Sequence, residues 1–240
     1  MAANSKTSPW VWVATGCGCA LLLIAGCFVG VGYLGFRQAK EIEEMMSDPE
    51  KRREAALDVL NAEELPPGYH PMMGFSVPFV MDTAILTDGE IVDDFDQESP
   101  DLGDRGFIYI KMLRFDTEDQ RELQDYFEGK TDDPRVLRRS NINVDLRPRD
   151  RIANGELPTG EGQLFWVSHR ADSLSHHGDR EALATMMSIQ CPDDERLRFG
   201  IFYGPDPTPE VAIAEADWTG TAADPAEIEA FTSYFDFCAP

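Results

Sequence analysis

Basic side chains are scarce in this sequence. Its 240 residues include 21 Lys and Arg against 44 Asp and Glu, which gives a formal net charge of −23. Proteins that bind the phosphate backbone of nucleic acids need clustered Lys and Arg, because these side chains displace the condensed counterions. The charge balance therefore argues against a nucleic-acid partner, and it disfavours contact with anionic lipid headgroups.

Motifs of the common catalytic sites are also missing. The sequence contains no P-loop and no dinucleotide-binding fingerprint, and its four histidines show no HExxH spacing. Residues 74–78 (Gly-Phe-Ser-Val-Pro) depart from the nucleophile elbow Gly-x-Ser-x-Gly at the last position. We therefore expect no cofactor, and an enzyme is the less favoured interpretation.

Charged side chains are entirely absent from residues 9–36. As a helix, Trp10–Phe36 would be about 40 Å long, against about 30 Å for the hydrocarbon core of a bilayer. This predicts a single-pass membrane protein that has the lipid bilayer as a partner. We divide the chain into an N-terminal tail (1–9), a transmembrane helix (10–36), a helical stalk or linker (37–64) and an acidic globular domain (65–240).

Two further features of the apolar segment bear on its role. Residues 24–27 (Ile-Ala-Gly-Cys) resemble the lipobox of bacterial lipoproteins, so one alternative is a lipoprotein lipidated at Cys27. The apolar run continues to Phe36 beyond that cysteine, which favours an uncleaved span. Gly26 and Gly30 form a GxxxG pair that lets two helix backbones approach closely, and they predict self-association.

Two features of the sequence predict opposite orientations of the span in the membrane. Arg37 and Lys40 lie just after the span and only Lys6 lies before it, so the positive-inside rule would place the domain in the cytoplasm. Long domains, however, cross the membrane largely regardless of charge, and the segment occupies the position of an export signal. We expect the C-terminal domain to be extracytoplasmic, and a cytoplasm-facing regulatory domain is an alternative.

The pattern of the remaining residues predicts an α+β domain. Strand-like runs follow one another without crossover helices, which favours one mainly antiparallel sheet of about six to eight strands. Helices are predicted from Thr117 to Gly129 and from Asp224 onward, where capping residues precede apolar faces. We expect both helices to cover one face of the sheet. The predicted strands are 72–77, 79–86, 106–115, 142–152, 163–170, 181–190 and 197–203.

Cysteine is rare outside the apolar segment, where it occurs only as Cys191 and Cys238. Cys191 continues the strand face of Met187 and Ile189, and Cys238 continues the helix face that includes Phe235. Both should point into the layer between the sheet and the last helix. We predict a disulfide between them, which requires an oxidising compartment; two buried free thiols are the alternative.

Two stretches contain residue types that bind metals. Imidazoles at His169, His176 and His177 could bind zinc and would support a metal-assisted hydrolase as an alternative function. Carboxylates of an acidic loop, including Asp94 and Asp96, could bind calcium, although the loop lacks the glycine and the glutamate of an EF-hand. A solvated acidic loop is the alternative for the carboxylates, and the histidines lack a helical spacing, with the adjacent His176 and His177 expected to point apart.

Arginines form one basic patch in this acidic chain. Arg147, Arg149 and Arg151 alternate along a predicted strand, a pattern that could hold a small anionic ligand or a protein partner. Pairing with the surplus carboxylates is the alternative. From the anchor and the missing catalytic motifs, we expect a non-enzymatic, extracytoplasmic domain that binds a ligand or a partner.

Overall fold

The computed structural model describes residues 48–78, 80–89, 103–113, 118–131, 133, 135–136, 146–172, 181–192 and 194–239. These residues belong to one compact unit that begins at Asp48. The predicted transmembrane helix, with Gly26, Cys27 and Gly30, lies outside the described residues. No helix in the described ranges is both long enough and apolar enough to cross a membrane.

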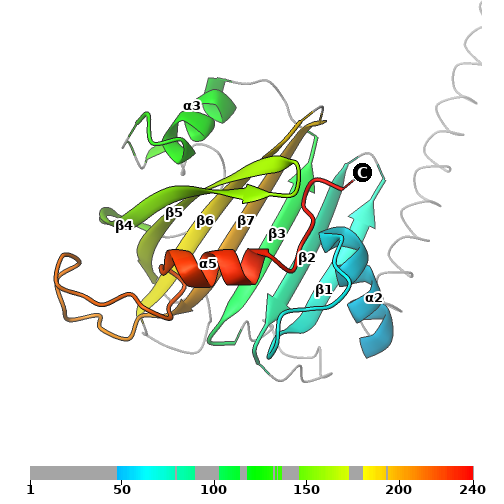
Figure 1. The fold of residues 1–240 in the computed structure, drawn as a ribbon, viewed down its shortest axis with the longest axis horizontal. Coiled ribbons are helices and arrows are strands. Elements are labelled where there is room, and N and C mark those ends of the chain that lie inside the picture. Colours follow the sequence, from blue (N-terminus) through cyan, green and yellow to red (C-terminus); the bar gives the residue numbers. More distant parts are fainter. Residues whose placement is uncertain are drawn as a thin grey trace, which may run out of the picture. The chain divides into compact units, whose positions relative to one another are not determined.

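Seven strands form a single sheet, and every neighbouring pair in it is antiparallel (Figure 1). The spatial order is β1-β2-β3-β7-β6-β5-β4, so β1 and β4 are the edge strands. The predicted α+β class with an antiparallel sheet is therefore confirmed. The strands are β1 (His70–Val77), β2 (Met81–Thr87), β3 (Gly106–Met112), β4 (Leu146–Thr159), β5 (Gly162–Asp172), β6 (Glu181–Cys191) and β7 (Asp194–Pro205).

Strand β4 extends further than the sequence predicts. The prediction ends this strand at Ile152, whereas it continues to Thr159 and pairs with β5 up to the Thr159–Gly162 pair. Pro158 is tolerated there because β4 is an edge strand and one of its sides needs no backbone donor. The local pattern failed because Asn154 and Gly155 have low strand propensity, and pairing with β5 overrides it.

The helices cover both faces of the sheet, so the prediction that two helices lie on one face is wrong. Helix α3 (Glu118–Phe127) packs in a cluster with Met186, whereas α5 (Pro225–Thr232) packs in a cluster with Met187. Successive residues of a strand point to opposite faces. Strand β6 is buried from Ala182 to Ile189 without alternation, so its sequence could not assign either helix to a face.

Helix α2 (Pro49–Leu60) belongs to the globular unit and not to a stalk that ends at residue 64. Its N-terminus is capped by Asp48, whose side chain accepts from the backbone of Glu50 and Lys51. Ala56 and Leu60 are fully buried against the sheet. A Cβ atom placed on Gly74 of β1 would lie 2.5 Å from the backbone nitrogen of Ala56, so helix and strand are in direct backbone contact.

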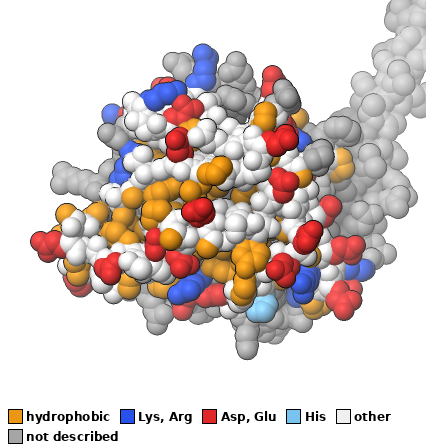
Figure 2. Space-filling model, viewed as in Figure 1, with side chains coloured by type: hydrophobic (Ala, Val, Ile, Leu, Met, Phe, Trp, Pro, Cys, Tyr) orange, Lys and Arg blue, Asp and Glu red, His pale blue; other side chains and the backbone are white. Residues whose placement is uncertain are grey.

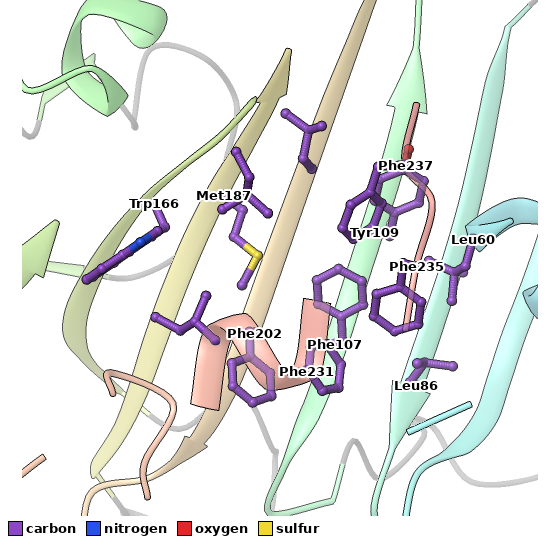
Figure 3. Close-up of a cluster of buried hydrophobic side chains, with 14 of the residues drawn as sticks. Leu60, Leu86, Phe107, Tyr109, Trp166, Met187, Phe202, Phe231, Phe235 and Phe237 are labelled. Carbon is purple, nitrogen blue, oxygen red and sulfur yellow. The ribbon is translucent and has the colours of Figure 1, made fainter. Parts of the chain in front are cut away.

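An aromatic cluster fills the layer between the sheet and the C-terminal segment (Figure 3). The ring of Phe107 on β3 stacks on that of Phe235 at 5.6 Å between centroids, and Tyr109 lies 5.2 Å from Phe237. Aromatic pairs of this kind add about 0.5–1.5 kcal/mol each beyond their buried area. The C-terminal residues after α5 are therefore part of the core.

Candidate ligand pocket

A disulfide joins the end of β6 to the C-terminal segment. It links Cys191 and Cys238, the pair that the sequence predicts, with the two Cα atoms 5.4 Å apart. A Cβ atom on Gly162, at the start of β5, would lie 2.4 Å from the Cys238 sulfur. The bridge therefore fixes the C-terminal segment against the β4–β5 turn and over the aromatic cluster.

A pocket of about 450 Å³ opens beside α5, and we call it the α5 pocket. This volume lies in the range of small-molecule sites. Figure 2 shows hydrophobic side chains at the surface on the face that carries α5, with acidic side chains around them. The pocket is lined by residues of five segments: 66–69, Arg105, 202–207, 219–222 and 227–234.

The inner wall of the α5 pocket is aromatic. The rings of Tyr69 and Phe231 meet edge to face with centroids 5.1 Å apart, and Phe202 stacks on Phe231 at 4.3 Å. Tyr234, just after α5, adds a partly exposed ring to the lining, as Tyr69 does, whereas Phe202 and Phe231 are buried. Burial, together with the nearby carboxylates and against the opposing effect of Arg105, raises the pKa of Tyr69 to about 12, so its hydroxyl stays protonated and can donate a hydrogen bond.

Only two of the residues that line the α5 pocket are charged. Arg105 precedes β3 and Glu227 lies in the first turn of α5, and both are exposed. Both act electrostatically on the Tyr69 hydroxyl, with opposite signs. Within the part of the chain that the structure describes, neither side chain has an ion-pair partner. One positive and one negative group thus remain free to contact a ligand.

One outer wall of the pocket is held by Arg170 of β5. Its guanidinium bonds to Asp206 at 2.7 Å and donates to the backbone carbonyls of Thr208 and Val211, each at 2.7 Å. It also lies 5.2 Å from the ring centroid of Trp218. Because these contacts fix the segment between β7 and α5, they fix the pocket residues within it.

Neither the α5 pocket nor the role of Arg170 was predicted from the sequence. Tyr69, Arg105 and Glu227 are far apart in the sequence and share no spacing that could indicate a site. One local signal existed: Arg170 interrupts an apolar strand, and a buried arginine needs a carboxylate partner. That signal does not identify Asp206 as the partner, because only the fold brings β5 and the end of β7 together.

His169 lies in the interior under α3. It is 2% exposed, and its Nε2 shares a hydrogen bond of 2.8 Å with the Tyr126 hydroxyl. Burial, with a smaller contribution from the charge of Arg151, lowers its pKa to about 4, so the ring is neutral at neutral pH.

The other predicted metal ligands cannot be placed. The described residues do not include His176, His177, Asp94 or Asp96. The predicted zinc and calcium sites are therefore not tested. Among the described residues, no three His, Cys, Asp or Glu side chains come together as a metal site. The metal-assisted hydrolase stays a prediction that depends on His176 and His177.

The arginine patch is placed in part. Arg151 lies with its guanidinium carbon 5.4 Å from the ring centroid of Tyr126, a cation–π contact. Upstream of the patch, Arg135 pairs with Asp133 at 2.9 Å. The side chains of Arg147 and Arg149 lie outside the described residues, so a shared anion site stays a prediction.

Comparison of the sequence with models of known protein families and with curated proteins gave no match.

Proposed function

We propose that this chain is a membrane-tethered, non-enzymatic protein whose globular domain binds a ligand outside the cytoplasm through the α5 pocket. The anchor comes from the sequence, since residues 9–36 carry no charge and are long enough to span a bilayer. The extracytoplasmic location is supported by the Cys191–Cys238 disulfide, because disulfides persist in oxidising compartments.

The observation that carries the proposal is the construction of the pocket. Its aromatic wall is packed from behind by Phe107, which lies 5.1 Å from Phe231, and its outer wall is fixed by Arg170. A binding site with fixed walls loses little conformational entropy when the ligand enters. An apolar wall with a few convergent polar groups is the usual composition of a small-molecule site.

The proposal is tested by blocking the pocket. The exposed Ala230 of α5 lines it, whereas the exposed Ala226 of the same helix does not. The full-length protein in maltoside micelles is screened against a small-molecule library by thermal shift, and hits are repeated with Ala230→Trp and Ala226→Trp. We expect hits whose stabilisation is lost in the first variant and kept in the second. A library without hits, or hits that survive Ala230→Trp, would contradict the proposal.

A further inference from the structure

We infer that the α5 pocket binds a small zwitterion that carries a quaternary ammonium group next to an anionic group. This inference rests on the proposed function of the pocket as a ligand site. It names the chemical class of the ligand, and each part of that class corresponds to a feature of the pocket wall.

The aromatic wall suits a cation. Tyr69 and Tyr234 are partly exposed rings that line the pocket, and Tyr69 packs edge to face on Phe231, which is buried and stacked on Phe202. The face of an aromatic ring is electrostatically negative, and a cation within about 6 Å of the centroid is attracted to it. Recognition of quaternary ammonium groups by several rings is the principal functional use of this interaction.

The two charges of the pocket suit a zwitterion. Glu227 is the acidic residue of the lining and favours a positive ligand group, whereas Arg105 is the basic one and can pair with a carboxylate or a phosphate. Both side chains are exposed and unpaired among the described residues.

The walls favour a quaternary over a primary ammonium group. A primary ammonium has three N–H donors, and each donor buried without an acceptor costs free energy. The carboxylate of Glu227 is the single ionised acceptor of the lining, and the neutral acceptors beside it include the hydroxyls of Thr219 and Thr221. A quaternary ammonium has no N–H group, so aromatic walls can replace its weakly bound water without leaving a donor unsatisfied.

The class is tested with choline and its neutral isostere, 3,3-dimethylbutanol, in which carbon replaces the nitrogen. Binding to the full-length protein is measured by isothermal titration calorimetry in maltoside micelles, which contain no choline. We expect choline to bind at least about tenfold more tightly than the isostere, a difference of about 1.4 kcal/mol. Equal affinity for the two compounds, or no binding of choline, would overturn the inference.

Substitutions of single pocket residues test which side chains contact the ligand. Tyr69→Leu and Tyr234→Leu should each weaken choline binding several-fold, whereas Tyr69→Phe, which keeps the ring, should not. Glu227→Gln should weaken both choline and phosphocholine, and Arg105→Gln should weaken phosphocholine alone. An unchanged affinity in both ring-removing variants would overturn the inference even if choline binds.

A competition experiment identifies the source of the ligand. A comparison with Ala230→Trp distinguishes failure of this inference from failure of the proposed function. Vesicles of phosphatidylcholine, but not of phosphatidylethanolamine, should compete with phosphocholine if the ligand is a lipid headgroup; no competition indicates a free solute, and both results support the class. If choline does not bind but another compound does, and Ala230→Trp abolishes that binding, the inferred ligand class is wrong and the proposed function of the pocket still holds. If Ala230→Trp weakens the binding of no compound, both the inferred ligand class and the proposed function are wrong.

Discussion

Arg170 and Asp206 form a buried ion pair that joins β5 to the segment between β7 and α5, which forms the outer wall of the α5 pocket. The Arg170 Nε lies 2.7 Å from an Asp206 carboxylate oxygen, and the Asp206 side chain is 0% exposed. The same carboxylate accepts the backbone N–H of Thr208. A buried carboxylate with these partners specifies a single position for the start of this segment.

Arg170→Met should destabilise the domain strongly, because it leaves the Asp206 carboxylate buried without its cation. Breaking a buried pair from one side costs about 3–5 kcal/mol. Urea unfolding of residues 48–240 measures this loss, and hydrogen exchange of residues 206–222 should rise. Arg135→Met, which removes an exposed partner of Asp133, is the matched control and should leave the stability nearly unchanged. Similar losses in the two variants would contradict the role of Arg170.

Gly74→Ala should destabilise the domain by roughly 1–3 kcal/mol, the usual cost of inserting atoms into a packed contact. The added methyl group would overlap the backbone of Ala56, which cannot move without shifting α2. Gly204→Ala is the control, since its Cβ would lie at an ordinary 3.6 Å from the Cβ of Ala222. Chemical denaturation of both variants measures the change in the free energy of unfolding. An unchanged value for Gly74→Ala would show that α2 does not pack as described.

Cys238→Ser should lower the free energy of unfolding by about 3–4 kcal/mol in the loop-entropy model. The bridge closes a loop between residues 47 positions apart. Thermal unfolding is measured with and without dithiothreitol. The reductant should lower the unfolding temperature of the natural domain and leave that of Cys238→Ser unchanged. If the reductant does not change the unfolding temperature of the natural domain, the disulfide is contradicted.

His169 should make the domain less stable as the pH falls. Its pKa is about 4 in the folded state against a usual 6.5, so the unfolded chain binds a proton between these values and the folded domain does not. The stabilisation is complete above about pH 6.5 and is lost progressively as the pH falls towards 4, by up to about 3 kcal/mol. NMR titration of the ring measures the pKa, and a midpoint near 6.5 would contradict its burial.

A variant separates His169 from the many carboxylates that titrate at lower pH. His169→Gln keeps a group that can bond to Tyr126 but removes the proton-binding imidazole. Its free energy of unfolding should depend less steeply on pH between 4 and 6.5 than that of the natural domain. Identical slopes would assign the pH dependence to other groups.

The sequence predicted those features that depend on one element at a time. The periodicity around Met187 and Ile189 places Cys191 on the face that the C-terminal segment covers, and the predicted disulfide is present. The expectation that Cys238 continues the helix face of Phe235 is wrong, because α5 ends at Thr232 and Cys238 lies in the segment after it. The cap of α5 at Asp224 was readable from its residue type.

Features that depend on several elements were beyond the sequence. The polar character of α2 indicated a stalk, because only four of its residues, Arg52, Ala56, Val59 and Leu60, are buried. The α5 pocket combines Tyr69, Arg105 and Glu227, whose proximity follows from the strand order and from nothing local. Pockets assembled in this way become visible only when the topology is known.

The account rests on a domain that is tethered to a membrane and faces away from the cytoplasm. The most direct test fuses alkaline phosphatase or green fluorescent protein to the C-terminus in a bacterial host and assays the membrane fraction. We expect active phosphatase in the membrane pellet and no fluorescence from the second fusion. Fluorescence with inactive phosphatase, or unprocessed protein in the supernatant after ultracentrifugation, would contradict the account.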